Sequence, residues 1–270
     1  GVQYETGLEI YTTSALRDHE AGVLSIGHEV RFTLTIPPAT SDFTVVGHCS
    51  SACTKRNVPA GGINIINVLL HSHMAGRQLK LRHFREGVEL PFVAQDSNYD
   101  FNYQQNRVLP EYRKVLGGDH LTYECVYDST GREPPEAVTG GLSTRQEMCL
   151  AILMYYPRIP HLDMCGSHVR EEEILMSLGI QRADINMLDP MIRAPEKYAN
   201  KRYSEVVSHL VPWSDTLKKE FREIARFSNH KEVCESYHSD LYRLASQVTY
   251  PVFVPFTPAD ANVCEKGLII

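Results

Sequence analysis

The sequence lacks the features that mark membrane-spanning, nucleic-acid-binding and repeat proteins. It has no run of about 18 apolar residues that could form a transmembrane helix, and its first residues lack a signal-peptide pattern. Lys and Arg number 27 against 33 Asp and Glu, so no basic excess would attract nucleic acid or an anionic membrane. It has no internal repeat and no low-complexity segment. What remains is an ordinary globular composition, 43% hydrophobic and 22% charged, which can bury a sizeable core.

The seven cysteines lack the close spacing of a redox or zinc site. Cys49-x3-Cys53 is one residue too long for a redox Cys-x-x-Cys pair, and no second close pair completes a zinc site. An odd count allows three disulfides with one cysteine left over, or free thiols throughout. The sequence also lacks an Asn-x-Ser/Thr glycosylation site. Spacing alone therefore leaves the pairing and the cellular compartment open.

The chain divides into two regions by secondary-structure pattern. Up to about residue 158, short β-rich runs alternate with turn signals, which is typical of an antiparallel sandwich. The expected strands are 8–12, 29–36, 43–46, 63–70, 78–84, 121–127 and 147–157. Helical apolar spacing follows in the segments 169–178, 195–210, 216–227 and 236–247. We therefore predict a mainly β fold: a sandwich domain of residues 1–165, with a helical or irregular C-terminal extension, residues 166–270, packed on it.

One stretch combines a buried strand with a pair of histidines. Val, Ile and Leu crowd positions 63–70 without a helical period, which predicts a buried strand. Because side chains alternate along a strand, His71 and His73 project from the same face, with Cα atoms about 6.5–7 Å apart. Such a pair can converge on one metal ion, although twelve histidines make a chance His-x-His unsurprising. A metal site would need a third ligand from elsewhere.

The candidate for that ligand is Met148, in the second long apolar stretch. Met and Cys on a buried strand usually belong to the core. A thioether is, however, a soft ligand that suits Cu(I) beside two imidazoles, whereas zinc prefers His, Cys and carboxylate. A His-His-Met set therefore favours copper over zinc.

Four motifs follow one another in an order that resembles a known family. They are HSHMAGR at 71–77, GDHLTYEC at 118–125, GG at 140–141, and the segment from EMC to YYP at 147–157. The chain from about residue 7 to 165, and more weakly to 234, resembles the copper type II ascorbate-dependent monooxygenases, in the branch of dopamine β-hydroxylase and the DBH-like monooxygenases. The resemblance implies two stacked jelly-roll-like β-sandwich domains, and this chain looks like the second of them.

The resemblance also implies roles for particular residues. The family binds its catalytic copper, CuM, through a His-x-His pair and the Met of a Glu-Met-Cys motif, which are His71, His73 and Met148 here. Tyr155 matches a tyrosine implicated in catalysis, although a tyrosine packed at a strand end would look the same. The family's second copper, CuH, lies in a first domain. The chain starts at Gly1 within what looks like folded sequence, so we expect it to be a piece of a longer protein without that domain.

The same resemblance implies a disulfide pattern and a compartment. It pairs Cys49 with Cys165, Cys53 with Cys234, and Cys125 with Cys149, and leaves Cys264 over. Three disulfides imply an oxidising lumen, so we expect the endoplasmic reticulum, a secretory vesicle or secretion. A membrane tether would lie outside this chain.

Three departures bear on the substrate. Peptidylglycine hydroxylases carry an Arg, an Asn and a Tyr where this chain has Leu69, Leu150 and Ile152, so a peptide carboxylate is disfavoured and the pocket should be apolar. We therefore predict the CuM domain of a monooxygenase that uses O2 and ascorbate to hydroxylate a C–H bond of a small, apolar or aromatic, amine-like substrate. Its expected protein partners are the N-terminal CuH domain and a second copy in a homodimer. The alternative is a lumenal copper-binding or interaction module without turnover of its own.

Overall fold

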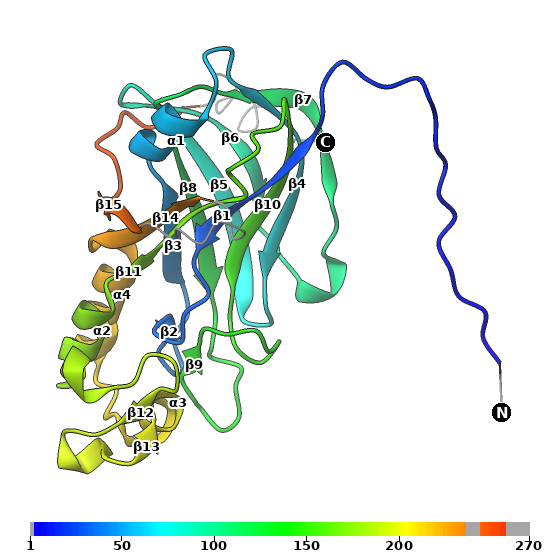
Figure 1. Ribbon diagram of the computed structural model, residues 1–270. Helices are drawn as coiled ribbons and strands as arrows, with labels where there is room; N and C mark the ends of the chain where they lie inside the picture. The colour runs from blue at the N-terminus through cyan, green and yellow to red at the C-terminus, as the bar shows by residue number, and fades with distance from the viewer. Residues whose placement is uncertain (1–2, 236–243, 258–270) are drawn as a thin grey trace, which may run out of the picture.

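Two β-sheets stacked as a sandwich form the body of the protein (Figure 1). The computed structural model describes residues 3–235 and 244–257. The larger sheet has seven strands in the order β15 (Leu244–Val248), β14 (His230–Glu235), β11 (Met164–Val169), β1 (Gly22–His28), β10 (Cys149–Tyr156), β4 (Ile63–Ser72) and β7 (Arg107–Val115). The smaller sheet has four, in the order β3 (Phe43–Cys49), β8 (His120–Tyr127), β5 (Gly76–Arg85) and β6 (Val88–Asp96). Neighbours pair antiparallel, except for β1 and β11, which are parallel.

The core lies between the two sheets. Alternate residues of β4 and β10 point inward and are buried, such as Leu70 and Leu153, and they meet the inward face of β8, which carries the buried Tyr123. This alternation is the two-residue period of a strand with one covered face. The main prediction from the sequence, a mainly β antiparallel sandwich, is therefore confirmed.

Two disulfides join the sheets across the core. Cys125 of β8 is bonded to Cys149 of β10, and Cys49 of β3 to Cys165 of β11. The two sheets also touch directly where β1 passes β3, because a Cβ on Gly47 would lie 1.9 Å from the carbonyl carbon of Gly27. The two sheets are thus joined by two covalent bonds and one close backbone contact.

The C-terminal region shares the larger sheet and covers the smaller one. The helices α2 (Glu171–Ser177) and α4 (Asp215–Phe227) contact each other, and α4 packs against β3. Beyond β15 the chain crosses to β6, where the backbone of Val254 bonds to those of Gly87 and Glu89. The boundary proposed at residue 165 falls within β11, and the division into two domains remains a proposal. Among the described residues, no helix is long and apolar enough to cross a membrane.

The remaining elements are short. They are the helices α1 (Ser51–Asn57), η1 (Phe101–Tyr103), η2 (Arg182–Asp184), η3 (Glu196–Tyr198), α3 (Tyr203–Glu205) and η4 (Val206–Leu210), and the paired strands β2 (Thr35–Ile36) with β9 (Val138–Thr139) and β12 (Met191–Ile192) with β13 (Lys201–Arg202).

Several expected elements are wrong in detail. Residues 8–12 form no strand, because their segment runs away from the sheets and has no partner strand (Figure 1). Of 29–36, only the end forms β2, because a turn from Arg31 to Leu34 interrupts it. The helix expected over 195–210 is broken at Asn200, whose φ of 61° is left-handed. Of the helix expected over 236–247, residues 236–243 lie outside the described residues, and the rest belongs to β15.

Candidate metal centre

His71 and His73 lie together at one end of the larger sheet. His71 is near the end of β4, and His73 comes directly after it. Their ring centroids are 5.1 Å apart and the rings are nearly perpendicular, at 84°. His73 is 4% exposed, and His71 is half-buried. The alternation expected of a strand therefore brings both imidazoles to one place.

Both imidazoles are held through Nδ1. The Nδ1 of His71 lies 2.5 Å from Oε1 of Gln104, and the Nδ1 of His73 lies 2.9 Å from the carbonyl oxygen of Gln146. Since both partners accept, each Nδ1 carries the hydrogen and each Nε2 keeps its lone pair. Burial lowers the pKa of His71, which favours the neutral form that can bind a metal. Metal-binding histidines are usually oriented in this way, with the other ring N–H donating to an oxygen.

Met148 comes from the neighbouring strand. In the register of β10 with β4, Cys149 lies opposite Ser72 and Leu150 opposite His71. Continued one step beyond the ends of both strands, this register would place Met148 opposite His73, and the alternation of side chains would put it on the same face as both histidines. The three side chains named from the sequence thus come from adjacent strands at one end of the sheet. Two imidazoles and a thioether form a donor set that suits Cu(I).

A buried carboxylate ties these two strands together. The Glu147 side chain is 0% exposed and accepts hydrogen bonds from the backbone N–H groups of His73 at 2.9 Å and Ala75 at 2.6 Å. It also accepts one of 3.1 Å from the hydroxyl of Ser72. Burial raises its pKa, and these donors oppose the rise. In the sequence Glu147 stands out only as part of the Glu-Met-Cys motif, and no local pattern indicates this role.

Three tyrosine hydroxyls complete the support. Tyr127 donates to the carbonyl oxygen of Met148 at 2.7 Å, and Tyr123 accepts from the N–H of His71 at 3.1 Å. Tyr99 bonds to both backbone groups of Ser72. Sequence alone gives no sign of this support. The tyrosines are 21 to 52 positions away from the residues that they contact, and the contacts are to backbone atoms.

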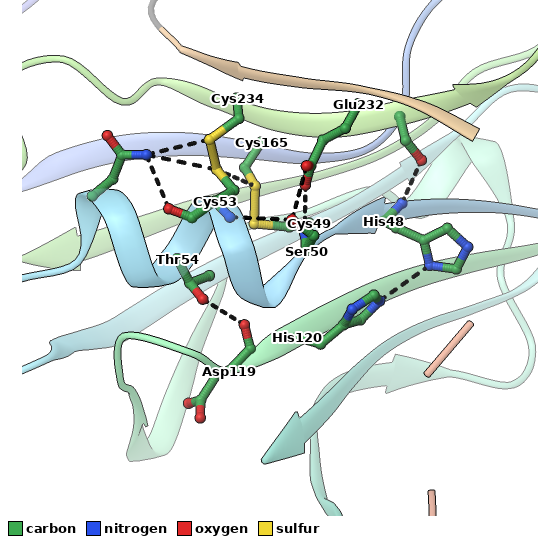
Figure 2. The surroundings of a disulfide bond; sticks show 12 residues. His48, Cys49, Ser50, Cys53, Thr54, Asp119, His120, Cys165, Glu232 and Cys234 are labelled. Atoms are coloured by element: carbon green, nitrogen blue, oxygen red, sulfur yellow. Dashed lines mark hydrogen bonds between the residues drawn. A yellow bond between two sulfur atoms is a disulfide. The ribbon is translucent and has the colours of Figure 1, made fainter. Parts of the chain in front are cut away.

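The Cys125–Cys149 disulfide lies next to this site. Cys149 follows Met148 directly, so the bond anchors the strand of the proposed thioether ligand to the smaller sheet. Figure 2 shows the other two bonds, Cys49–Cys165 and Cys53–Cys234. The structure thus forms the same three pairs that the family resemblance implies. Cys264 lies outside the described residues.

A group of cysteine sulfurs is no second metal site. The sulfurs of Cys49, Cys53 and Cys165 lie within 4.8 Å of one another, but each belongs to a disulfide (Figure 2). Disulfide sulfur is not the thiolate that binds metals. The cluster is therefore structural.

Tyr155 lies apart from the three proposed ligands. It is seven residues beyond Met148, about 23 Å along a strand. Its side chain is 0% exposed and packs over Gly22, and its hydroxyl accepts from the N–H of Ile159 at 3.1 Å. This is the position of a packed tyrosine at a strand end, so we do not include it in the proposed site.

The sheet surface beside the histidines is apolar. Leu150 pairs with His71 and Ile152 with Leu69, all on the same face. The three aliphatic side chains are neither fully buried nor fully exposed. A molecule near His71 would therefore meet hydrocarbon rather than a charged group on these two strands.

Comparison with known proteins agrees with this geometry. Residues 19–177, more than half of the chain, match the family described as "Copper type II ascorbate-dependent monooxygenase, C-terminal domain". The chain belongs to this family. It is 38% identical over 213 residues to DBH-like monooxygenase protein 1 of Homo sapiens, and 37% over 274 residues to that of Mus musculus. It is 34% identical over 169 residues to dopamine beta-hydroxylase of Bos taurus.

The family members are much longer than this chain. The aligned regions cover 77%, 99% and 63% of this chain, but only 34%, 44% and 27% of the human, mouse and bovine relatives. The chain thus spans less than half of the length of these copper monooxygenases, and what the whole protein does is a matter of proposal.

Proposed function

We propose that this chain is the catalytic copper domain of an ascorbate-dependent monooxygenase and that His71, His73 and Met148 hold the copper. The observation that carries the proposal is the fixed tautomer of both histidines, which leaves two Nε2 lone pairs beside the strand of a thioether. Bound copper would supply the redox chemistry that activates O2. The chain's own part is to hold three soft or neutral ligands rigidly through Gln104 and Glu147.

The proposed substrate is small, apolar or aromatic, and amine-like. Leu69, Leu150 and Ile152 line the sheet beside His71, and none can pair with a carboxylate. These aliphatic side chains support an apolar reacting group, whose burial is favourable. The amine is inferred from family resemblance alone.

Coupled hydroxylation takes two electrons, whereas a single copper cycling between two oxidation states supplies one. We therefore propose that the whole protein includes a second domain with the CuH ion, reduced by ascorbate, and that this chain alone does not turn over. The secretory lumen is the proposed location, because the three disulfides need an oxidising compartment. A homodimer remains a further proposal.

The first test concerns the metal. With one copper at this site, X-ray absorption should show a sulfur neighbour, and Met148→Ile should remove it. The matched control is Met154→Ile, which changes a 39% exposed methionine on the same strand and should leave the sulfur signal intact. Persistence of the sulfur signal in Met148→Ile would show that the thioether is not a ligand.

The second test concerns turnover. A longer protein that carries both domains should consume O2 with ascorbate and a panel of phenethylamines and release hydroxylated product. The 270-residue chain should release no hydroxylated product, even where it consumes O2. The other candidate function, a copper-binding module without turnover, predicts no product from either protein.

A further inference from the structure

A second pair of imidazoles lies inside the protein, away from His71 and His73. His48 is near the end of β3 and His230 begins β14, and both side chains are 0% exposed. Their ring centroids are 5.0 Å apart, against 5.1 Å for the first pair. A metal about 2.0 Å from an imidazole nitrogen lies about 3.2 Å from the ring centroid, so two ligands of one ion have centroids about 5–6 Å apart. The spacing fits two ligands of one ion.

In the second pair, too, each Nδ1 has a partner, but the partners are hydroxyls, which can donate or accept. The Nδ1 of His48 also lies 3.3 Å from Nε2 of His120 (Figure 2). The Nδ1 of His48 lies 2.9 Å from the hydroxyl oxygen of Thr122, and the Nδ1 of His230 lies 2.9 Å from that of Ser167. Ser167 also accepts a hydrogen bond of 2.8 Å from the backbone N–H of His48, so it contacts both residues of the pair. Within the described residues, neither Nε2 has a hydrogen-bond partner, although both are buried. Native proteins rarely leave buried nitrogens of this kind without a partner.

The surroundings of the pair contain mainly aromatic rings. His120 and Tyr250 lie 5.3 and 5.1 Å from His48, between ring centroids, and His28 lies 6.2 Å from His230. Burial, followed by the neighbouring imidazoles, lowers the pKa of both His48 and His230, so both are neutral and able to bind a metal.

The charged group that acts on the pair is His168, which is itself bound to two carboxylates. His168 acts electrostatically on His230, and it forms ion pairs of 2.8 Å with Glu29 and 3.2 Å with Glu171. The electrostatic influences on His48 come from His120 and His28. Among the described residues, no carboxylate forms an ion pair or hydrogen bond with either ring of the pair.

We infer that His48 and His230 form a second metal site, through their Nε2 atoms, that takes a single Cu(I). The cost of burying an ion grows with the square of its charge, so a site without a carboxylate favours a monovalent ion over Zn²⁺ or Cu²⁺. Imidazole nitrogen is also a ligand that suits copper.

The test counts copper in the 270-residue chain under anaerobic conditions, with Cu(I) supplied from its bicinchoninate complex. We expect two Cu(I) per chain, one at each histidine pair. His48→Gln and His230→Gln should each bind one, and that one should keep its sulfur neighbour in X-ray absorption, which also shows that the variant is folded. The control His161→Gln changes an exposed histidine and should still bind two.

A second variant tests the new site without altering it. The double change His71→Gln and His73→Gln should leave one Cu(I) with nitrogen neighbours and no sulfur. Uptake of one Cu(I) by the unaltered chain together with none by this double variant would overturn the inference and leave the first site standing. That result would mean that a buried water, not an ion, satisfies the two Nε2 atoms. Unchanged uptake of two by His48→Gln would overturn it as well.

Discussion

The carboxylate of Glu147 accepts a hydrogen bond of 2.9 Å from the backbone N–H of His73. Met148 is the next residue along the chain, so this one contact fixes the strand of the proposed thioether against the segment of a proposed imidazole. The carboxylate is fully buried, and the bond is therefore not weakened by competing water. The geometry of the proposed centre depends on this link between β4 and β10.

Glu147→Gln should loosen that link. The amide keeps the size of the side chain, but its NH2 would face backbone N–H groups that now donate to oxygen. We expect the free energy of unfolding to fall by about 1.5–3 kcal/mol, the usual worth of hydrogen bonds to a charged group, and copper affinity to fall with it. Chemical denaturation and Cu(I) competition measure the two effects. Glu133→Gln, at an exposed position, is the control and should change neither.

Gln104→Leu should weaken copper binding without unfolding the protein. Gln104 is the partner of Nδ1 of His71, and without it the ring can rotate and change tautomer. Loss of such a partner typically costs about 10–100-fold in metal affinity. The neighbouring Gln105 is exposed, so Gln105→Leu is a matched control with the same change in polarity. Equal affinities in the two variants would contradict the orienting role.

The strands that carry the centre could be predicted because their signal is local. An apolar run over 63–70 identifies β4, and alternation then places His71 and His73 on one face. The support from Gln104 and Glu147 could not be predicted, because it depends on how β4, β10 and the loop before β7 meet. The disulfide pairs likewise came from family resemblance and not from spacing.

The C-terminal errors have a related cause. Residues 244–247 have helical spacing, but β14 offers them an open edge, and pairing there overrides local preference. The proximity of His48 and His230 also depends on a tertiary contact, in this case between β14 and β3. No pattern in a single sequence joins residues so far apart.

Removing the Cys125–Cys149 disulfide should affect both stability and copper. Changing both cysteines to Ser should cost roughly 2–4 kcal/mol in the free energy of unfolding. It should also lower copper affinity, since Cys149 adjoins Met148. Removing Cys49–Cys165 in the same way is the control, because that bond also joins the two sheets but adjoins no proposed ligand of the first site. The control should be destabilised with the first site intact. A similar loss of the sulfur-bound copper from both variants would point to general unfolding.

The last prediction concerns pH and the buried ion pairs of His168. Its ring lies 2.8 Å from Glu29 and 3.2 Å from Glu171, and these pairs raise its pKa although burial alone would lower it. A raised histidine pKa stabilises the fold fully below the unfolded value of about 6.5, and this contribution is lost as pH rises through the folded pKa. Burial would raise the pKa of Glu171, but its hydrogen bonds with His168 and Lys231 lower it. The stability that Glu171 contributes is therefore lost only in stronger acid.

His168→Gln should therefore destabilise the chain more in mild acid than in base. Denaturant titrations of both proteins at about pH 5.5 and about pH 8.5 straddle the histidine range, and the difference between wild type and variant should shrink at the higher pH. His161→Gln, at an exposed position, should give no such pH-dependent difference. Buried neutral histidines such as His28, whose pKa burial lowers to about 4, destabilise both proteins in acid. Taking the difference between the two free energies of unfolding at each pH cancels this effect. A difference that is constant with pH would mean that His168 is neutral and that its contacts with the two carboxylates carry no charge.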